Sequence, residues 1–157
     1  MLQAGSLQYA KRLNRLWSRI ASTFSLSPAD TRNLLPYSNI FRDHLAHPRN
    51  GGELADANAV AEQTNPVCGD RIRLSLRISD GRIEAAQFLA YGCPPTLVCG
   101  SAITVMVPGL RVEEAMALTR QDLLTTIGGL PSRKQHAAAL AIDTLFDALH
   151  NWIGNSA

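Results

Sequence analysis

The three cysteines are the side chains of this sequence with the widest range of possible chemistry. Cys93 and Cys99 lie six residues apart in "YGCPPTLVCGS", and Cys68 lies in "NPVCGD". Thiols at such spacings can form a disulfide, act as a redox couple, pack in the core or bind a metal. An odd number of cysteines without a recognisable secretory signal favours a reducing compartment, where thiols are more often ligands or reactive groups. We therefore expect a cytoplasmic protein of bacterial type.

Asp70 and His136 are the other candidate ligands. Gly69 separates Cys68 from Asp70 and lets the chain bend so that both side chains converge on one ion, although such a pattern alone more often marks a buried cysteine beside a turn. His136 alone would more often be a surface or capping histidine. Two thiolates, a carboxylate and an imidazole together suit tetrahedral Zn²⁺, or a [2Fe–2S] cluster held less firmly than one with four cysteines.

A hairpin is the element that would bring these thiols together. Residues 71–78, "RIRLSLRI", alternate apolar and polar side chains, which predicts a strand with one buried face. Asp80-Gly81 follows as a hairpin turn, and residues 83–91 supply the return strand. Paired positions around this turn sum to about 161, as do 68 and 93. Cys68 and Cys93 are therefore expected at the same end of the sheet.

The remaining elements predict an α+β fold. A third strand is expected within residues 56–64, which gives a small three-stranded antiparallel sheet. Helices are expected to begin near Pro36 and within residues 98–107, 112–119 and 120–127. A long C-terminal helix would begin near Pro131, end at Gly154 and bury a stripe of apolar side chains. Strands followed by helices indicate α+β architecture, with the helices packed on the sheet.

Composition and charge restrict the function classes. The 157 residues suffice for one domain with its own core, and no apolar run reaches transmembrane length. The first 29 residues contain four basic residues and no acidic one, whereas the rest of the chain carries a formal charge of −2. We therefore expect no nucleic-acid partner, because the body lacks a basic stripe.

The N-terminal segment predicts a separate extension. Residues 7–24 read as a basic amphipathic helix, which could pack on its own domain, dock on a surface or serve as a targeting peptide. The targeting alternative would place the protein in the mitochondrial matrix. We accordingly expect an extension over residues 1–33 and a single domain over residues 34–154.

Four motifs together resemble a known family, the iron–sulfur cluster assembly scaffolds of the IscU type, which also form the amino-terminal domain of NifU. The resemblance covers residues 37–152. Its motifs are an opening helix and turn, a first ligand motif, a hairpin ending in a second cysteine, and a segment that precedes the last helix: "YSNIFRDHLAHPRNGG", "NPVCGD", "ISDGRIEAAQFLAYGC" and "LPSRKQHAAALA".

The resemblance implies a function and a set of site residues. The family ligand positions correspond to Cys68, Asp70, Cys93 and His136. A member of this family accepts sulfur from a cysteine desulfurase, combines it with iron and passes a transient [2Fe–2S] cluster to recipient apo-proteins. It is a scaffold or carrier rather than an enzyme, although an acceptor role like that of a sulfurtransferase is compatible with it.

The sequence departs from the family pattern in three places. Ala137 stands where the third family cysteine would follow His136. Pro94-Pro95 replace small residues after the second cysteine and are expected to stiffen that loop. Residues 130–134 keep the ends Leu130-Pro131 and Lys134 of a stretch that the family uses for co-chaperone or chaperone recognition, but not its centre.

Cys99 and two alternative functions remain open at the level of sequence. Cys99 could be a packing thiol, a substitute third sulfur ligand or a disulfide partner of Cys93. Instead of a cluster scaffold, the protein could be a zinc-bound sulfur acceptor of the SufU type, with zinc at the same four positions. It could also be a module that binds the desulfurase and carries no cluster.

Overall fold

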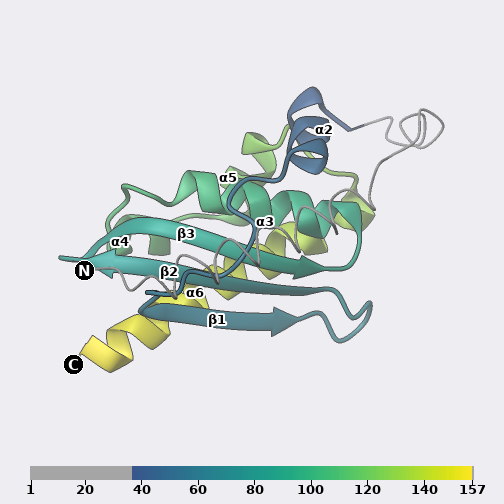
Figure 1. The fold of residues 1–157 in the computed structure, drawn as a ribbon. Helices are drawn as coiled ribbons and strands as arrows, with labels where there is room; N and C mark the ends of the chain where they lie inside the picture. Colours follow the sequence, from purple (N-terminus) through teal and green to yellow (C-terminus); the bar gives the residue numbers. More distant parts are fainter. Residues whose placement is uncertain (1–36, 157) are drawn as a thin grey trace.

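The computed structural model describes residues 37–156 and contains one sheet with helices packed on it. The predicted amphipathic helix over residues 7–24, and with it the whole proposed extension over residues 1–33, lies outside the described residues. The sheet is antiparallel, in the order β1-β2-β3. Its strands are β1 (Ala59–Thr64), β2 (Arg71–Ser79) and β3 (Arg82–Tyr91). All three predicted strands are therefore confirmed (Figure 1).

The hairpin between β2 and β3 follows the predicted register to within one residue. Asp80 and Gly81 both have positive φ, 52° and 72°, as a two-residue hairpin turn of this kind requires. Ser79 pairs with Arg82, at a sum of 161, but a bulge at Arg77/Ile78 shifts the ladder to 162. The pairing still brings the start of β2 beside the end of β3.

The helices begin and end close to the predicted positions, with two corrections. The helix containing Cys99 begins at Pro94, with Cys93 as its N-cap, so the two prolines start a helix instead of stiffening a loop. The last helix begins at His136, because a short 3-10 turn occupies the preceding residues. The helices are α2 (Asn39–Ala46), α3 (Pro94–Met106), α4 (Val112–Met116), α5 (Arg120–Thr126), η2 (Ser132–Lys134) and α6 (His136–Ser156).

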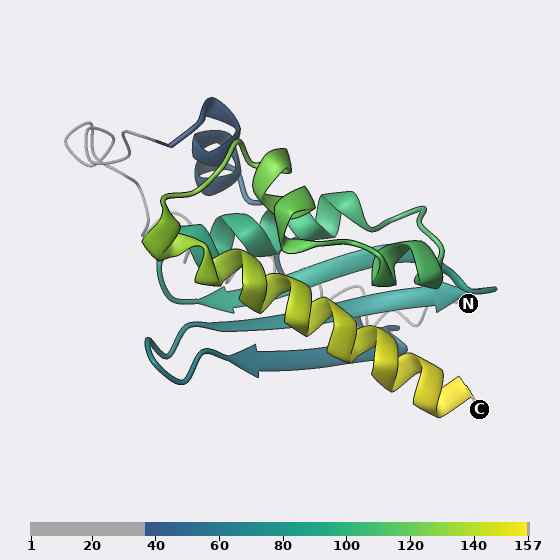
Figure 2. The same ribbon diagram turned by 180° about the vertical axis from the view of Figure 1, so that it is seen from behind.

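One face of the sheet carries the core. Helix α6 runs across β1 and β2, and α3 lies beside it against β3 (Figure 2). The inward side chains of β2 are at most 4% exposed to solvent, as their alternation predicts. They are Ile72, Leu74, Leu76 and Ile78. Because both long helices pack on the same face, the N-terminus of α6 and that of α3 can reach the same end of the sheet.

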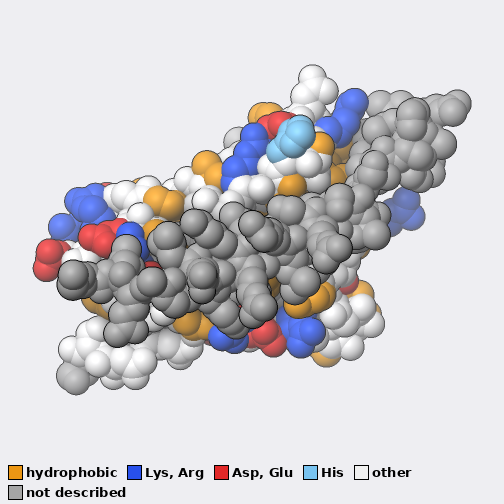
Figure 3. Space-filling view, in the orientation of Figure 1, with side chains coloured by type: hydrophobic (Ala, Val, Ile, Leu, Met, Phe, Trp, Pro, Cys, Tyr) orange, Lys and Arg blue, Asp and Glu red, His pale blue; other side chains and the backbone are white. Residues whose placement is uncertain are grey.

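The opposite face of β2 is polar, and its arginines are paired with acids. Arg71 lies 3.6 Å from Glu62, and Arg77 contacts both Asp56 and Glu84 at 2.8 and 3.0 Å. Several basic side chains accordingly lie directly beside acidic ones in Figure 3. Ser75 was expected to be exposed on this face but is 3% exposed, because the segment before β1 covers it and Leu54 N donates to its hydroxyl.

The turn after α2 is attached to α3 by buried polar groups. His44 Nδ1 lies 2.8 Å from Ser101 Oγ, which also accepts a hydrogen bond from the Arg49 backbone N–H. Asn50, with a positive φ of 57°, reaches the hydroxyl of Thr104 on the same helix. In residues 37–156, none of the helices is long and apolar enough to cross a membrane.

Gly100 is predicted to be required for the close contact between α3 and β3. A Cβ at Gly100 would lie 2.5 Å from the ring of Phe88, which is fully buried. We expect Gly100→Ala to lower the unfolding free energy by about 1–3 kcal/mol, as overpacking does. Gly154→Ala is the matched control in α6, where nothing lies within 4 Å, and should be neutral or stabilising by up to about 1 kcal/mol. Urea unfolding of both variants measures the difference, and equal effects would contradict the prediction.

His44 is predicted to make stability depend on pH. Burial, followed by the neighbouring Arg49 guanidinium, lowers the pKa of the His44 imidazole. The unfolded chain therefore binds more protons below the ordinary histidine pKa of about 6.5, so the folded state should lose stability from pH 7 toward pH 5. His44→Gln should flatten this dependence, while His150→Gln, at an exposed position of α6, should leave it unchanged. Thermal melts across this pH range provide the test, and equal slopes in His44→Gln and wild type would rule it out.

Candidate metal centre

Cys68 and Asp70 are presented by the loop between β1 and β2. Asn65 N donates to the Asp70 carbonyl at 2.7 Å and Gly69 N to the Asn65 carbonyl at 2.8 Å, so the loop closes on itself. Gly69 has a positive φ of 76°, the bend that a glycine was expected to allow. Strand β2 begins only at Arg71. The bend at Gly69, and not the alternation of side chains along a strand, therefore brings the side chains of Cys68 and Asp70 together.

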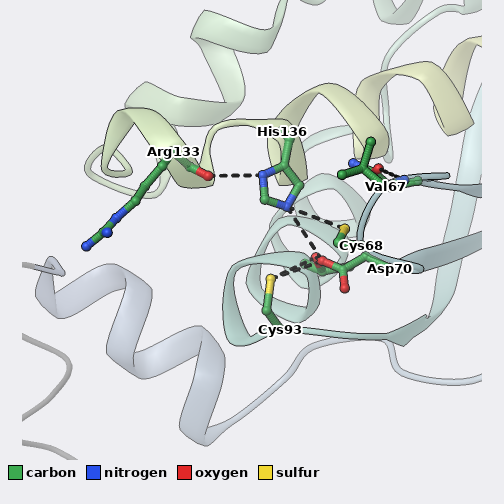
Figure 4. A network of polar contacts seen from close by, with 8 residues as sticks. Val67, Cys68, Asp70, Cys93, Arg133 and His136 are labelled. Atoms are coloured by element: carbon green, nitrogen blue, oxygen red, sulfur yellow. Dashed lines mark hydrogen bonds and ion pairs between the residues drawn. The ribbon is translucent and has the colours of Figure 1, made fainter.

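Cys93 is placed at the same end of the sheet by β3. The strand ends at Tyr91, and Gly92 with a φ of 138° turns the chain into α3. Cys93 Sγ lies 3.1 Å from Asp70 Oδ2, to which its thiol donates (Figure 4). The hairpin therefore brings the Cys93 thiol beside the loop that carries Cys68 and Asp70.

His136 is the first residue of α6 and is oriented by the turn before it. Its Nδ1 lies 3.2 Å from the Arg133 carbonyl oxygen. A carbonyl oxygen can only accept, so Nδ1 donates to it, and in the neutral imidazole Nε2 keeps a free lone pair. Histidine ligands of metals are commonly held in this way, with the other ring nitrogen donating to a backbone carbonyl. Figure 4 shows Nε2 directed at Cys68 and Asp70.

The side chains of Cys68, Asp70 and His136 form one group of potential ligands. Their donor atoms all lie within 4.8 Å of one another, with Nε2 at 3.9 Å from Cys68 Sγ and at 3.7 Å from Asp70 Oδ2. Zn²⁺ binds nitrogen and sulfur at about 2.0–2.3 Å, which separates tetrahedral ligands by roughly 3.5 Å. Two of the observed spacings, 3.7 and 3.9 Å, are close to that value, and Cys93 adjoins the group through Asp70.

Asp70 is the electrostatic centre of the group. Burial, the largest influence, would raise the pKa of its carboxyl, but hydrogen bonds from Cys93 and Thr96 outweigh burial and lower this pKa. Burial is also the main reason that the pKa of the Cys93 thiol is raised. Cys68 is exposed and Cys93 is half-buried, so the two thiols differ in access. The site thus combines one open sulfur with one held by a carboxylate.

Cys99 and Ala137 both lie away from the donor atoms of this group. Cys99 is fully buried on α3, and burial raises the pKa of its thiol to about 12. That environment corresponds to the packing alternative for Cys99. Ala137 is also fully buried, directly after His136. Among the described residues, no side chain in this group replaces the third family cysteine. All three cysteines of the described part of the chain are free thiols, so Cys93 and Cys99 form no disulfide.

Two residues of the site were not identified from the sequence. The Thr96 hydroxyl donates to Asp70 Oδ2 at 2.8 Å, and Gly92 lies so close to Asp70 that a Cβ there would be 2.3 Å from Oδ1. The signal for Thr96 was its position directly after a proline pair that begins a helix. Reading Pro94-Pro95 as part of a loop concealed it, since a loop gives Thr96 no fixed direction.

The fold and this donor set define a small α+β domain with a mixed sulfur, oxygen and nitrogen cluster at one end of its sheet. Residues 36–157 match the model of the NifU-like N terminal domain, and the chain belongs to this family. The resemblance and the fold class expected from the sequence are both confirmed.

Curated relatives and solved structures agree with that membership. The chain is 39% identical over 113 residues to an iron–sulfur cluster assembly scaffold protein IscU of Archaeoglobus fulgidus, covering 72% of this chain and 74% of the relative. It is 42% identical over 114 residues to the nitrogen fixation protein NifU of Cereibacter sphaeroides, covering 73% of this chain but only 46% of that longer protein.

Among solved structures, the NifU-like N-terminal protein of Brucella abortus superposes with a TM-score of 0.62 at 16% identity, covering 74% of this chain and 94% of that one. A SUF-system scaffold protein of Fervidobacterium islandicum superposes with a TM-score of 0.56 at 18% identity, covering 74% and 98%. At these identities the two structures support the fold alone.

Gly92 is predicted to be essential to the geometry of Asp70. Gly92→Ala would strain a backbone of positive φ and also push Asp70 out of position. Gly109→Ala is the matched control, because Gly109 has a φ of 92° with nothing within 4 Å of the added Cβ. Both should lose about 1–3 kcal/mol to backbone strain. Only Gly92→Ala should also weaken Zn²⁺ binding in a chelator competition, and equal affinities of the two variants would refute this role.

Proposed function

We propose that this protein is an iron–sulfur cluster assembly scaffold that holds a transient [2Fe–2S] cluster as its cargo. The proposed ligands are Cys68, Asp70, Cys93 and His136. The observation that carries the proposal is the convergence of a thiol, a carboxylate and an imidazole within 4.8 Å, with a second thiol hydrogen-bonded to the carboxylate. Curated relatives are named as scaffold proteins for cluster assembly, which supports a carrier role rather than an enzymatic one.

The donor set suits a cluster that must be released. A carboxylate oxygen is a poorer ligand for an iron–sulfur cluster than a thiolate, so Asp70 makes the cluster more labile than four cysteines would. Cys68 is exposed, so one ligand of the cluster is open to an incoming protein. A scaffold has to give up what it assembles, and both features favour transfer over permanent storage.

A cysteine desulfurase is the proposed sulfur donor, and recipient apo-proteins are the proposed acceptors of the cluster. Val67, next to Cys68, is 93% exposed, which leaves the tip of this loop accessible to a docked protein. The chaperone-recognition segment is proposed for residues 130–134, where Ser132 and Arg133 are exposed beside the site. The turn that presents this segment also orients His136.

A zinc-bound sulfur acceptor is the second candidate function. It is favoured by the spacing of the ligand group, which matches a single tetrahedral ion with Cys93 available as the fourth ligand. In that case Zn²⁺ would be bound at one ion per chain, and sulfur would be carried as a persulfide on one cysteine.

Reconstitution distinguishes the two candidates. The full chain is incubated anaerobically with ferrous iron, a cysteine desulfurase, L-cysteine and a thiol reductant that converts persulfide sulfur to sulfide. Wild type should develop the visible absorption and Mössbauer spectrum of a [2Fe–2S] cluster. Cys68→Ser and Cys93→Ser should each lose most of this signal, because each removes a thiolate ligand.

Cys99→Ala is the matched control for these variants. Its sulfur lies in the core, so the variant should still assemble the cluster at near wild-type yield. A wild-type protein that stays colourless and retains one Zn²⁺ per chain would reject the scaffold and favour the zinc-bound acceptor. Loss of the cluster in Cys99→Ala alone would reject the proposed ligand set.

A further inference from the structure

The hydroxyl of Thr96 is a buried polar group with a specific partner in the site. Thr96 is fully buried, and its Oγ1 donates to Asp70 Oδ2 at 2.8 Å. A hydroxyl inside a protein costs free energy unless it is hydrogen-bonded, and this one bonds the carboxylate and also lies 3.4 Å from Cys93 Sγ. The carboxylate in turn is only 6% exposed and needs such donors to stay ionised.

The direction of this hydroxyl is fixed by the start of α3. Pro94 and Pro95 occupy the first two helical positions, where their missing N–H groups would have no helical partner. Thr96 follows at the third position, and its backbone N–H bonds the Cys93 carbonyl at 3.0 Å. The helix therefore begins in one defined geometry, with the Thr96 side chain facing the loop that carries Asp70.

Asp70 is confined on its other side by Gly92. The glycine leaves just enough room for Oδ1, since a Cβ there would lie 2.3 Å from that oxygen. With Oδ1 against Gly92, the other oxygen Oδ2 faces Thr96 and Cys93 and lies 3.7 Å from His136 Nε2. Among the two carboxylate oxygens, Oδ2 is thus the one oriented toward the neighbouring donor groups.

We propose that Thr96 is a positioning residue for metal binding, which holds Asp70 Oδ2 toward the ion. This inference rests on the proposed function, in which Asp70 is a ligand. A carboxylate oxygen has two lone-pair directions, so Oδ2 can accept the Thr96 hydroxyl and still bind an ion. With an ion bound, Cys93 would serve as a thiolate, its proton released to solvent, and the Thr96 hydroxyl would keep its hydrogen bond to Oδ2.

The size of the expected effect follows from comparable sites. Groups that hydrogen-bond a ligating side chain typically change metal affinity by about 10–100-fold when they are removed. Thr96→Val keeps the shape of the side chain and removes only the hydroxyl. We therefore expect Thr96→Val to bind Zn²⁺ about 10–100-fold more weakly than wild type, and Thr96→Ser to restore most of the affinity.

The experiment measures Zn²⁺ binding to the full chain by competition with a chromophoric chelator, at one pH, without iron or sulfur. Co²⁺ absorption spectra of the same proteins report the ligand geometry independently of affinity. Thr144→Val is the matched control, because Thr144 is also a fully buried threonine on a helix, and its hydroxyl donates to the Leu140 carbonyl and to none of the proposed ligands. Thermal melts of the metal-free proteins verify that each variant is folded.

The proposal is supported if Thr96→Val binds Zn²⁺ more weakly than wild type and has an altered Co²⁺ spectrum, while Thr96→Ser and Thr144→Val resemble wild type in both. It is overturned if Thr96→Val binds as wild type does, if Thr96→Ser fails to recover affinity, or if Thr144→Val loses as much. A wild-type protein that binds neither Zn²⁺ nor Co²⁺ would overturn the proposed ligand set together with this inference. Equal affinities of wild type and Thr96→Val would overturn this inference alone.

Discussion

The antiparallel pairing of β2 with β3 is the interaction on which the candidate site depends. It pairs Arg71 at the start of β2 with Tyr91 at the end of β3. The loop of Cys68 and Asp70 directly precedes Arg71, and Cys93 follows two residues after Tyr91. A turn of two residues fixes the register, because any slip by one residue would move every core side chain of β2 to the polar face. The same constraint that builds the core therefore holds Cys93 beside the loop of Cys68 and Asp70.

Asp70 connects the two halves of the site. It receives hydrogen bonds from Cys93 and Thr96, which belong to the start of α3, and it faces His136 at the start of α6. A buried carboxylate without donors would be costly, so the polar groups around it are needed for stability before any metal binds. Under the proposed function, an ion would replace the Cys93 thiol as a partner of Asp70, while the Thr96 hydrogen bond would remain.

The structure gives a packing role to the residues that depart from the family pattern near the site. The missing third cysteine is replaced by Ala137, which contributes to the core at the start of α6. The proline pair after Cys93 is not a stiffened loop but the first turn of α3, and it directs Thr96 toward Asp70. The surplus Cys99 is a core residue of the same helix. Helix α3 thus accounts for both the proline pair and Cys99.

The sequence by itself determined the strands, the position of the hairpin turn and the family, because alternation, Asp80-Gly81 and the spaced ligand motifs are local signals. It also predicted the meeting of Cys68 with Cys93 at one end of the sheet, since pairing around a turn follows from counting. It did not reveal the bulge at Arg77, nor that Ser75 would be covered. The covering of Ser75 depends on Leu54, 21 positions earlier in the chain.

Only the tertiary structure decided the environment of each thiol and the role of Thr96. The three cysteines are the same residue type, yet one is exposed, one is held by a carboxylate and one is sealed in the core. Thr96 reaches Asp70 across 26 positions of sequence. Burial and hydrogen-bond partners arise from the packing of α3 and α6 on the sheet, and no local pattern encodes which side chains that packing brings into contact.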